Sequence, residues 1–529
     1  MTPDTKTLAA EVSRRRTFAI ISHPDAGKTT LTEKLLLYGG AIHLAGSVKS
    51  RRASRHATSD WMELERQRGI SITSSVLQFD YAGHRINLLD TPGHQDFSED
   101  TYRTLTAADA AVMLIDCAKG VEAQTRKLFE VCRLRAIPIF TFVNKLDREG
   151  RPPLEILSEI EEVLGIAACP LYWPLGMGPR FRGVYDLRRR QVLLYEAEKH
   201  GQKKARARVA GPDDPAIAEL LSPWDYQAFR DEVALLEGAG EPHDLPAVLR
   251  GGQTPVFFGS AVTNFGVEPF LADFLTMAPP PGPRLAACGP VAPEEPRFSG
   301  FVFKIQANMD PRHRDRVAFV RVCSGHFRRG LKVRHPRLGR ELALAVPLQF
   351  LAQERALVEE AFPGDVVGLH DRGTLRIGDT LAEGDDVVFE GVPHFSPELF
   401  ARVRVKNALR AKQLQKGLEQ LGDEGAIQVF RQPWGDRDPI VGAVGQLQFE
   451  VLTHRLQGEY SVEARLEPMP FQLARWVEGE EPAPEALGRD ASTLLCEDRH
   501  GRPVVLFRSQ WALSWVAERH PSLALRAAA

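Results

Sequence analysis

The stretch FAIISHPDAGKTT, residues 18–30, constrains the fold more than any other part of this 529-residue chain. Its first four residues are apolar, as in a buried strand, and the Gly-Lys-Thr that follows is typical of a tight loop running into a helix. In such a loop the backbone N–H groups point at phosphates, Lys28 reaches the β- and γ-phosphates, and the Thr29 hydroxyl holds Mg²⁺. The match is complete except at Ser22, where Gly is usual. The pattern predicts a nucleotide site with these loop residues around the phosphates: Ser22, His23, Pro24, Asp25, Ala26, Gly27, Lys28, Thr29 and Thr30.

A second motif, Asp-Thr-Pro-Gly-His at residues 90–94, directly follows an apolar strand predicted at residues 85–89. A carboxylate at the end of that strand can hold Mg²⁺ through water, and the following glycine N–H can sense the γ-phosphate. The motif therefore predicts further nucleotide and metal contacts from Asp90, Thr91, Pro92, Gly93 and His94.

Two more motifs predict which base is bound. Asn-Lys-Leu-Asp follows the apolar strand expected at residues 137–143, and Gly-Ser-Ala follows the one at 255–258. Guanine offers N1–H and N2–H₂ to one carboxylate and adenine has no such pair, so Asp147 should reject ATP by roughly 10⁴ or more. Four motifs in this order, each at the carboxyl end of a strand, predict a GTP site. The expected base contacts are Asn144, Lys145, Asp147, Ser260 and Ala261.

Alternating apolar and amphipathic segments predict an α/β sheet from the N-terminus to about residue 277. About 110 residues separate its last two strands, far more than one crossover needs, so a subdomain is inserted there. Within the insert, residues 153–164 have a helical pattern, residues 181–194 a strand pattern, and residues 201–215 the composition of a loop. Strands of the main sheet are expected at residues 18–21, 75–80, 85–89, 111–115, 137–143 and 255–258.

A proline-rich break at residues 279–283 ends this first domain. Short β-rich runs then predict a small β-barrel, and a strand–helix–strand–helix–strand pattern predicts a ferredoxin-like sandwich. The barrel strands are expected at residues 301–305, 317–324, 330–334 and 365–369, and the sandwich elements at 399–408, 411–422, 427–431, 443–451 and 460–466.

The expected organisation is thus multidomain. A P-loop GTPase α/β domain spans residues 1–283, with its insert at about 150–252. A β-barrel domain follows at residues 284–390, and an α+β domain of ferredoxin-like type at 391–529. The role and structure of the residues after about 477 stay open.

Composition points to the cytoplasm. Hydrophobic residues make up 43% and charged residues 26%, as in ordinary globular proteins. The six cysteines are scattered without a Cys-x-x-Cys pair, which favours a reducing compartment over a disulfide framework or zinc site. Residues 1–16 lack the apolar run of a signal peptide, and no stretch of about 20 apolar residues is present to span a membrane.

The net charge of −2 argues against a general polyanion binder, but the charge is unevenly distributed. Residues 300–340 hold eleven Lys or Arg and two Asp, which leaves nine positive charges, and residues 402–416 hold six Lys or Arg and no acid. Two basic faces on a nearly neutral protein favour docking to a phosphate-rich surface. Ordinary solvated surface charge is the alternative.

A family resemblance begins at His94. Small signalling GTPases have Gln at this position, whereas Asp-x-Pro-Gly-His resembles the translational GTPases, in which the histidine orients the attacking water. QRGISI, residues 67–72, is similar to the first switch of that superfamily, with Ser71 in the place of its metal-binding Thr. The resemblance implies a Mg²⁺ set of Thr29, Ser71 and, through water, Asp90. It also implies slow intrinsic hydrolysis, on the order of 10⁻³ s⁻¹ or less, because no arginine finger is recognisable.

Longer motifs narrow the resemblance to bacterial peptide chain release factor 3, the class II release factor. They are SHPDAGKT at 22–29, SDWMELE at 59–65, QRGISI at 67–72, WPLGMG at 173–178, FVFKIQANMDP at 301–311 and GAVGQLQFE at 442–450. The resemblance implies a GTPase stimulated by the 70S ribosome, which hydrolyses GTP to GDP and phosphate. Such a factor promotes the dissociation and recycling of class I release factors, which read stop codons. It implies a monomer with GTP or GDP and Mg²⁺ bound, acting on neither membrane nor DNA.

Three alternatives are open at this point. A translocation-type elongation factor shares the motifs and the insert, but it needs two further C-terminal domains. A factor that delivers tRNA would be shorter, lack the insert and have Gly in place of Ser22. A GTP-binding switch unrelated to the ribosome is disfavoured by His94 and the two basic faces, and co-sedimentation with ribosomes distinguishes it.

Overall fold

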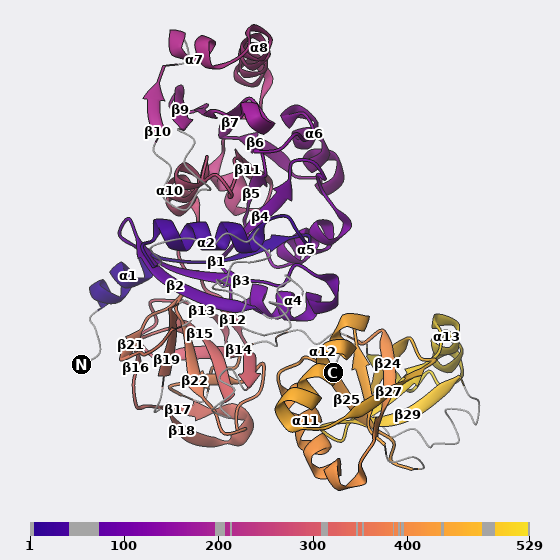
Figure 1. The fold of residues 1–529 in the computed structure, drawn as a ribbon. Helices are drawn as coiled ribbons and strands as arrows, with labels where there is room; N and C mark the ends of the chain where they lie inside the picture. Colours follow the sequence, from indigo (N-terminus) through magenta and orange to yellow (C-terminus); the bar gives the residue numbers. More distant parts are fainter. Residues whose placement is uncertain are drawn as a thin grey trace.

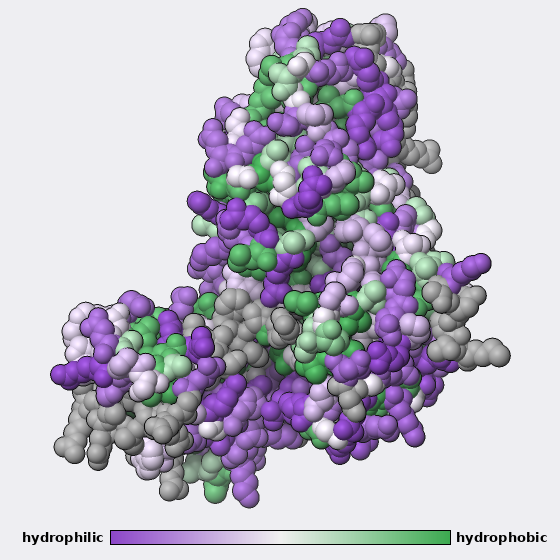
Figure 2. All heavy atoms as spheres, turned by 180° about the vertical axis from the view of Figure 1, so that it is seen from behind, coloured by the Kyte–Doolittle hydropathy of each residue, from purple (hydrophilic) through white to green (hydrophobic). Residues whose placement is uncertain are grey.

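The computed structural model describes residues 5–41, 74–195, 207–211, 214–307, 316–344, 347–351, 354–384, 386–389, 392, 396–434, 438–478 and 492–526. Figure 1 shows three lobes. An α/β lobe runs from β1 to α10, a barrel lobe from β12 to β23 lies beneath it, and a C-terminal lobe from β24 to β31 lies to one side. No helix among the described residues is long and apolar enough to cross a membrane. Seen from behind, apolar side chains are scattered among hydrophilic ones on all three lobes (Figure 2).

The α/β lobe is organised around a seven-stranded sheet with the order β2-β3-β1-β4-β5-β11-β6. β1 runs parallel to both of its neighbours, while β2 pairs antiparallel with β3 at the edge. Every residue of β1 and β4 is buried because helices cover both faces of the sheet. All six predicted strands are confirmed, and β6 is an addition that the sequence pattern missed. The strands are β1 (Arg15–Ser22), β2 (Ser75–Tyr81), β3 (His84–Asp90), β4 (Ala110–Asp116), β5 (Ile139–Asn144), β6 (Ala167–Pro170) and β11 (Gln253–Phe258), and the helices are α1 (Thr5–Ser13), α2 (Lys28–Tyr38), α4 (Ser98–Thr106), α5 (Ala123–Leu134), α6 (Pro153–Leu164) and α10 (Val267–Met277).

The insert forms its own four-stranded antiparallel sheet with the order β10-β9-β8-β7. The predicted helix at 153–164 is confirmed as α6. The predicted loop at 201–215 is wrong at residues 207–210, because β10 pairs there with β9 and its polar composition concealed the strand. The elements of the insert are β7 (Tyr172–Leu175), β8 (Gly183–Asp186), β9 (Gln191–Tyr195), β10 (Ala207–Ala210), α7 (Pro215–Leu220), α8 (Pro223–Ala239) and α9 (Leu245–Leu249).

The barrel lobe is an eight-stranded antiparallel sheet curled around its own apolar cluster, with the order β18-β17-β23-β14-β15-β22-β19-β20. The four predicted strands are confirmed as parts of β14, β15, β17 and β22. The strands of this lobe are β12 (Arg284–Ala286), β13 (Gly289–Val291), β14 (Ser299–Ala307), β15 (Arg316–Ser324), β16 (Phe327–Arg328), β17 (Leu331–His335), β18 (Arg340–Leu344), β19 (Pro347–Leu351), β20 (Glu354–Leu357), β21 (Glu360–Ala361), β22 (Val366–His370) and β23 (Thr380–Ala382).

The C-terminal lobe begins as the predicted ferredoxin-like sandwich. The sequence pattern missed β26, because this four-residue strand lies directly before the helix predicted at 443–451; that helix instead runs from 446 to 460. The chain after residue 477 adds strands to the same sheet through pairing of β29 with β25, which gives the order β27-β24-β26-β25-β29-β30-β28-β31. The elements are β24 (Leu399–Val405), α11 (Ala411–Asp423), β25 (Gln428–Arg431), β26 (Ile440–Ala443), α12 (Gln446–Tyr460), β27 (Ala464–Met469), β28 (Leu473–Glu478), β29 (Thr493–Asp498), β30 (Pro503–Phe507), α13 (Gln510–Arg519) and β31 (Ala524–Arg526).

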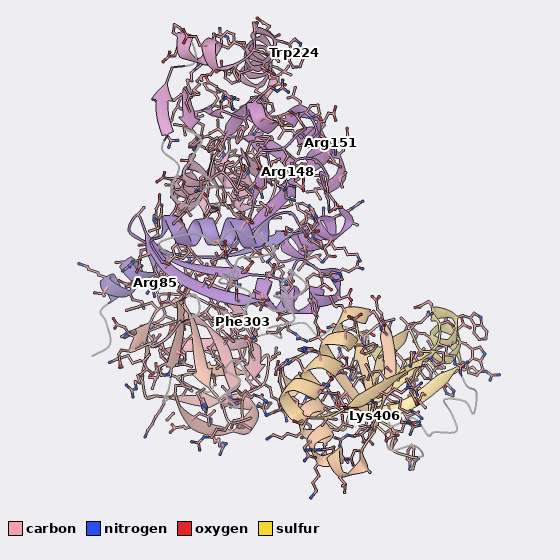
Figure 3. All side chains as sticks on the ribbon, in the orientation of Figure 1. Arg85, Arg148, Arg151, Trp224, Phe303 and Lys406 are labelled. Carbon is pink, nitrogen blue, oxygen red and sulfur yellow. The ribbon has the colours of Figure 1, made fainter. Side chains whose placement is uncertain are left out.

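The barrel lobe is joined to the α/β lobe by buried basic side chains. Arg321, only 1% exposed, donates from Nη2 to Oδ2 of Asp109 at 2.6 Å, and Phe303 is completely buried in the core that the two lobes share (Figure 3). Lys304 is also buried, with its Nζ on the carbonyl of Ser74. The expectation of a basic face at residues 300–340 is therefore wrong for Lys304, Arg316 and Arg321, which are buried in contacts between lobes. Other cations of this stretch are exposed: Arg329, Lys332, Arg337 and Arg340.

Candidate nucleotide site

The loop between β1 and α2 has the shape that the sequence predicts. It occupies residues 23–27, and the backbone is left-handed at Asp25 and Gly27, with φ of 65° and 98°. A Cβ on Gly27 would lie 2.5 Å from Nδ2 of Asn144, so only glycine fits this close approach. The first N–H groups of α2, which have no partner within the helix, lie at the end of the loop. An anion can be held there by backbone alone.

Lys28 and Asp90 come together at the centre of the site. Nζ of Lys28 donates to Oδ1 of Asp90 at 2.6 Å, and both side chains are almost completely buried. Thr91, also buried, donates from its hydroxyl to the carbonyl of Ile20 at 2.6 Å, which fixes the end of β3 to β1. Thr29 and Thr30 follow Lys28 in the first turn of α2 and are partly exposed.

The second predicted loop contacts the first. A Cβ on Gly93 would lie 3.5 Å from Cα of Pro24, so the two loops pack directly against each other. His94 is about one third exposed, and its Nδ1 accepts a hydrogen bond from the backbone N–H of Asp96 at 3.2 Å. The ring thereby caps the short 3₁₀ helix η1 (Gln95–Phe97).

The residues predicted to contact the base form one hydrogen-bonded group. Asn144 donates from Nδ2 to the carbonyl of Ala26 at 2.8 Å and accepts at Oδ1 from the N–H of Ala261 at 2.9 Å. Oδ1 of Asp147 accepts from the hydroxyl of Ser260 at 2.7 Å. These contacts connect three loops that are more than 100 residues apart in the chain.

Two residues around this group were missed by the sequence reasoning. Asp116, at the end of β4, accepts from Nζ of Lys145 at 2.7 Å, and the same Nζ donates to the carbonyl of Asp25. Burial alone would raise the pKa of Asp116, but the hydrogen bonds from Lys145 and from the N–H of Ala118 lower it below the usual range. Its position at the carboxyl end of a strand was the available signal. Cys117 is buried beside it, and burial raises the pKa of its thiol to about 12, so it is an inert packing group.

The side chain of His23, the first residue of the phosphate-binding loop, points into the protein with only 1% of the residue's surface exposed. Its ring contacts the carboxylate of Glu122. Burial lowers the pKa of His23, and the opposing effect of Glu122 does not restore it. The imidazole is therefore neutral at physiological pH, and it supports the loop from below.

The first-switch prediction, with Ser71, lies outside the described residues. The first described residue after the gap is Ser74, whose N–H and hydroxyl both donate to Oδ2 of Asp100, at 2.7 and 2.6 Å. Lys304 of the barrel lobe donates to the carbonyl of Ser74 and lies 3.4 Å from the same carboxylate oxygen. Ser74 is thus tied to α4 and to the barrel.

The donor set at the site suits Mg²⁺. Within the part of the chain that the structure describes, no three His, Cys, Asp or Glu side chains cluster to hold a metal by themselves. Asp90 and Thr29 instead offer oxygen donors at the ends of β3 and α2, beside the loop for phosphates. Mg²⁺ prefers this arrangement, with few protein oxygens and the remainder from phosphates and water.

Comparisons with known proteins agree with this geometry. The chain matches the model of the elongation factor Tu GTP-binding domain at residues 13–280, of elongation factor G domain 2 at 297–384, and of the C-terminal domain of class II release factor RF3 at 389–517. A crystal structure of ttk003000868 from Thermus thermophilus has a TM-score of 0.68 at 24% identity, covering 89% of this chain and 71% of that one. That likeness supports the fold alone. Fold and site together define a translational GTPase, an enzyme that binds guanine nucleotides and hydrolyses GTP.

The relatives identify the family. Peptide chain release factor 3 of Symbiobacterium thermophilum is 60% identical over 525 residues, covering 99% of both chains. The protein of the same name from Nostoc punctiforme is 57% identical over 523 residues, covering 99% of this chain and 96% of the relative. This chain belongs to the peptide chain release factor 3 family, and it is a GTPase of translation termination.

Proposed function

We propose that this chain is a ribosome-dependent GTPase that promotes the dissociation and recycling of class I release factors. One observation carries the proposal. The lobe that matches the release-factor model directly contacts the segment from Asp90 to the end of α4, here called the second switch, since the N–H of Leu447 donates to Oδ2 of Asp96 at 2.7 Å. The state of the nucleotide can therefore be transmitted to the lobe that distinguishes this family. The family names of the relatives support the same role.

Lys28 and the loop N–H groups bind the β- and γ-phosphates in this proposal. The buried ion pair with Asp90 supports the assignment. Lys28 and Asp90 lie 2.6 Å apart, so the cation can face a phosphate while the carboxylate faces the metal ion next to that phosphate. Thr29, Ser71 and, through water, Asp90 hold Mg²⁺. When bound, this ion neutralises charge that develops on the phosphate oxygens.

Asn144 and Asp147 read guanine. Asn144 orders the loops, and Asp147 presents its carboxylate to the N1–H and N2–H₂ of the base, with Ser260 holding one of its oxygens. The N–H of Ala261 is the donor assigned to the guanine carbonyl oxygen; in this structure it is bonded to Oδ1 of Asn144, so guanine binding requires it to share or leave that acceptor. A buried acceptor pair without a partner is costly, which is the physical basis for excluding adenine.

His94 positions the attacking water. It follows Gly93, whose loop packs on the phosphate-binding loop, and its ring is exposed enough to move. In this structure the ring caps η1, so hydrolysis requires it to turn toward the nucleotide. Contact with the ribosome is the proposed trigger for that turn.

The C-terminal lobe supplies a candidate for ribosome docking within the basic segment at residues 402–416. Residues 406–416 carry four cations and no acid, and Leu409 at their centre is 87% exposed. Lys406 lies on this lobe (Figure 3) and pairs with Glu463 at 2.8 Å, while the other cations, Arg410, Lys412 and Lys416, are exposed. We assign this segment to phosphates of ribosomal RNA, where counterion release favours binding. We further propose that the factor acts as a cytoplasmic monomer, with the 70S ribosome and class I release factors as partners.

The test follows a labelled class I release factor bound to 70S ribosomes after peptide release. Adding this protein with GTP should accelerate loss of the label, and ribosomes should raise the rate of GTP hydrolysis by about 10² or more. A GTP analogue that cannot be hydrolysed should still release the label once, without turnover. The proposal is contradicted if the label is lost equally fast with and without the protein and ribosomes do not raise the rate of GTP hydrolysis.

A further inference from the structure

Asp96, in η1, links the second switch to the C-terminal lobe. Its carboxylate is buried, and Oδ2 accepts from the N–H of Leu447 at 2.7 Å. Leu447 lies in the first turn of α12, where N–H groups have no partner within the helix and the helix dipole favours an anion. The carboxylate occupies the space beside the cap residue so tightly that a Cβ on Gly445 would collide with its Cγ and both of its oxygens.

The same residue holds His94. The backbone N–H of Asp96 donates to Nδ1 of the histidine at 3.2 Å, and Oδ1 of Asp96 lies 3.3 Å from that nitrogen. One aspartate therefore touches the ring that is proposed to orient water and the helix of another lobe. The carboxylate of Asp96 thus bonds to α12, and its backbone N–H bonds to the histidine.

A second contact fixes the next helix to the same lobe. Arg103 on α4 donates from Nη1 to the carbonyl of Gly425 at 3.2 Å and pairs with Glu99. A cavity lined by Phe97, Ile305, Leu452 and other residues lies between this helix, the barrel and the C-terminal lobe. The second switch is thus restrained from the C-terminal lobe at both ends, with free space next to it.

We propose that Asp96 is a positioning residue for GTP hydrolysis: while α12 holds its carboxylate, His94 stays in the capping position, and displacement of the C-terminal lobe releases the histidine. The inference rests on the proposed role of His94. It gives a reason for slow hydrolysis away from the ribosome, since the restraint is part of the chain itself. Movement of the C-terminal lobe then determines when GTP is hydrolysed.

Gly445→Ala breaks the contact from the side of the C-terminal lobe. Gly445 has extended backbone, φ −144° and ψ 163°, so alanine is conformationally allowed and acts through its Cβ on Asp96. Gly458→Ala is the matched control, because it makes the same change in the same helix where a Cβ meets nothing within 4 Å. Asp96→Ala breaks the contact from the other side, and Asp96→Asn keeps an oxygen that can accept from Leu447.

Single-turnover hydrolysis without ribosomes is measured for each variant, together with the KM for GTP and the melting temperature. Gly445→Ala and Asp96→Ala should each raise the rate about tenfold at unchanged KM, whereas Gly458→Ala and Asp96→Asn should stay near wild type. Adding His94→Ala to Gly445→Ala or to Asp96→Ala should remove the increase in the rate of hydrolysis. Unchanged or lower rates in both Gly445→Ala and Asp96→Ala, with normal melting temperatures, overturn the inference.

The two proposals fail in different ways. If His94→Ala alone leaves ribosome-stimulated hydrolysis normal, the assignment of His94 under the proposed function is wrong, and this inference falls with it. If His94→Ala lowers stimulated hydrolysis but releasing Asp96 has no effect, only the restraint by α12 is rejected.

Discussion

The two ends of the nucleotide site are built differently. At the base end, Asn144, Asp147, Ser260 and Lys145 bond to one another and to neighbouring loops of the α/β lobe. At the γ-phosphate end, Ser74, which follows the first switch, and Asp96, in the second switch, are held from outside the lobe. Lys304 of the barrel reaches Ser74, and α12 of the C-terminal lobe reaches Asp96.

This difference separates recognition of the base from control of GTP hydrolysis. A base site that closes within one lobe can bind guanine whatever the other lobes do. A γ-phosphate end that depends on two other lobes responds to their positions, because any movement of them changes contacts at Ser74 or Asp96. Substitutions at the base end should therefore change which base is bound. Those at the other end should change the response to the γ-phosphate, either in affinity for GTP over GDP or in the rate of hydrolysis.

The largest effect is expected at the base end. Asp147→Asn replaces an acceptor oxygen with a donor that faces the N–H groups of guanine, so GTP affinity should fall by roughly 10³ or more. Xanthine has a carbonyl at that edge, and XTP should bind the variant better than GTP. Equilibrium binding of labelled GTP and XTP to both proteins measures this. Full GTP affinity without any gain for XTP would show that Asp147 does not read the base.

Sequence reasoning could group most of the residues proposed for the base end because they belong to short local motifs. The strands before Asp90, Asn144 and Ser260 were all predicted, and the structure places these residues at the carboxyl ends of β3, β5 and β11. The other end could not be predicted, since the partners Asp96 and Leu447 are 351 residues apart. For the same reason Lys304, which resembled surface charge in the sequence, proved to be a buried contact.

The next effect concerns timing at the γ-phosphate end. His94→Ala should leave GDP and GTP affinity within a few-fold, while ribosome-stimulated hydrolysis falls by roughly 10² or more. The variant should still release a class I factor once and then remain on the ribosome. Single-turnover hydrolysis on purified ribosomes measures the rate. Because His94 caps η1 in this structure, stability should fall by about 1 kcal/mol in either case, and a near-normal rate would mean that capping is the whole role of the ring.

A smaller effect is expected from the barrel contact. Lys304→Met keeps the apolar stem and removes the charge that faces Ser74 and Asp100, so GTP affinity should fall about tenfold with GDP affinity nearly unchanged. The reason is that the first switch engages only the γ-phosphate. Lys332→Met, on an exposed lysine of the same lobe, is the control and should change neither. If the affinities for GDP and GTP fall equally, the substitution acts through the general stability of the protein and not through the first switch.

The smallest effect is a pH dependence of stability at the same contact. Burial would raise the pKa of Asp100, but Lys304, Ser74 and Arg103 lower it below the usual value of 3.8. A carboxyl group with a lowered pKa in the folded state contributes stability that is present above the unfolded pKa and is lost as pH falls through the folded value. Urea unfolding from pH 6 to pH 3 should therefore show wild type losing stability at the acid end.

In Lys304→Met the largest of the charges that lower the pKa of Asp100 is absent, so this pKa should be higher than in wild type, although Ser74 and Arg103 still oppose the effect of burial. The stability difference between the variant and wild type should then be greatest near pH 6 and shrink as the pH falls below 3.8 through the lowered pKa of Asp100 in wild type. A difference that stays constant across this range would mean that Lys304 contributes through its packed stem and not through its charge on Asp100.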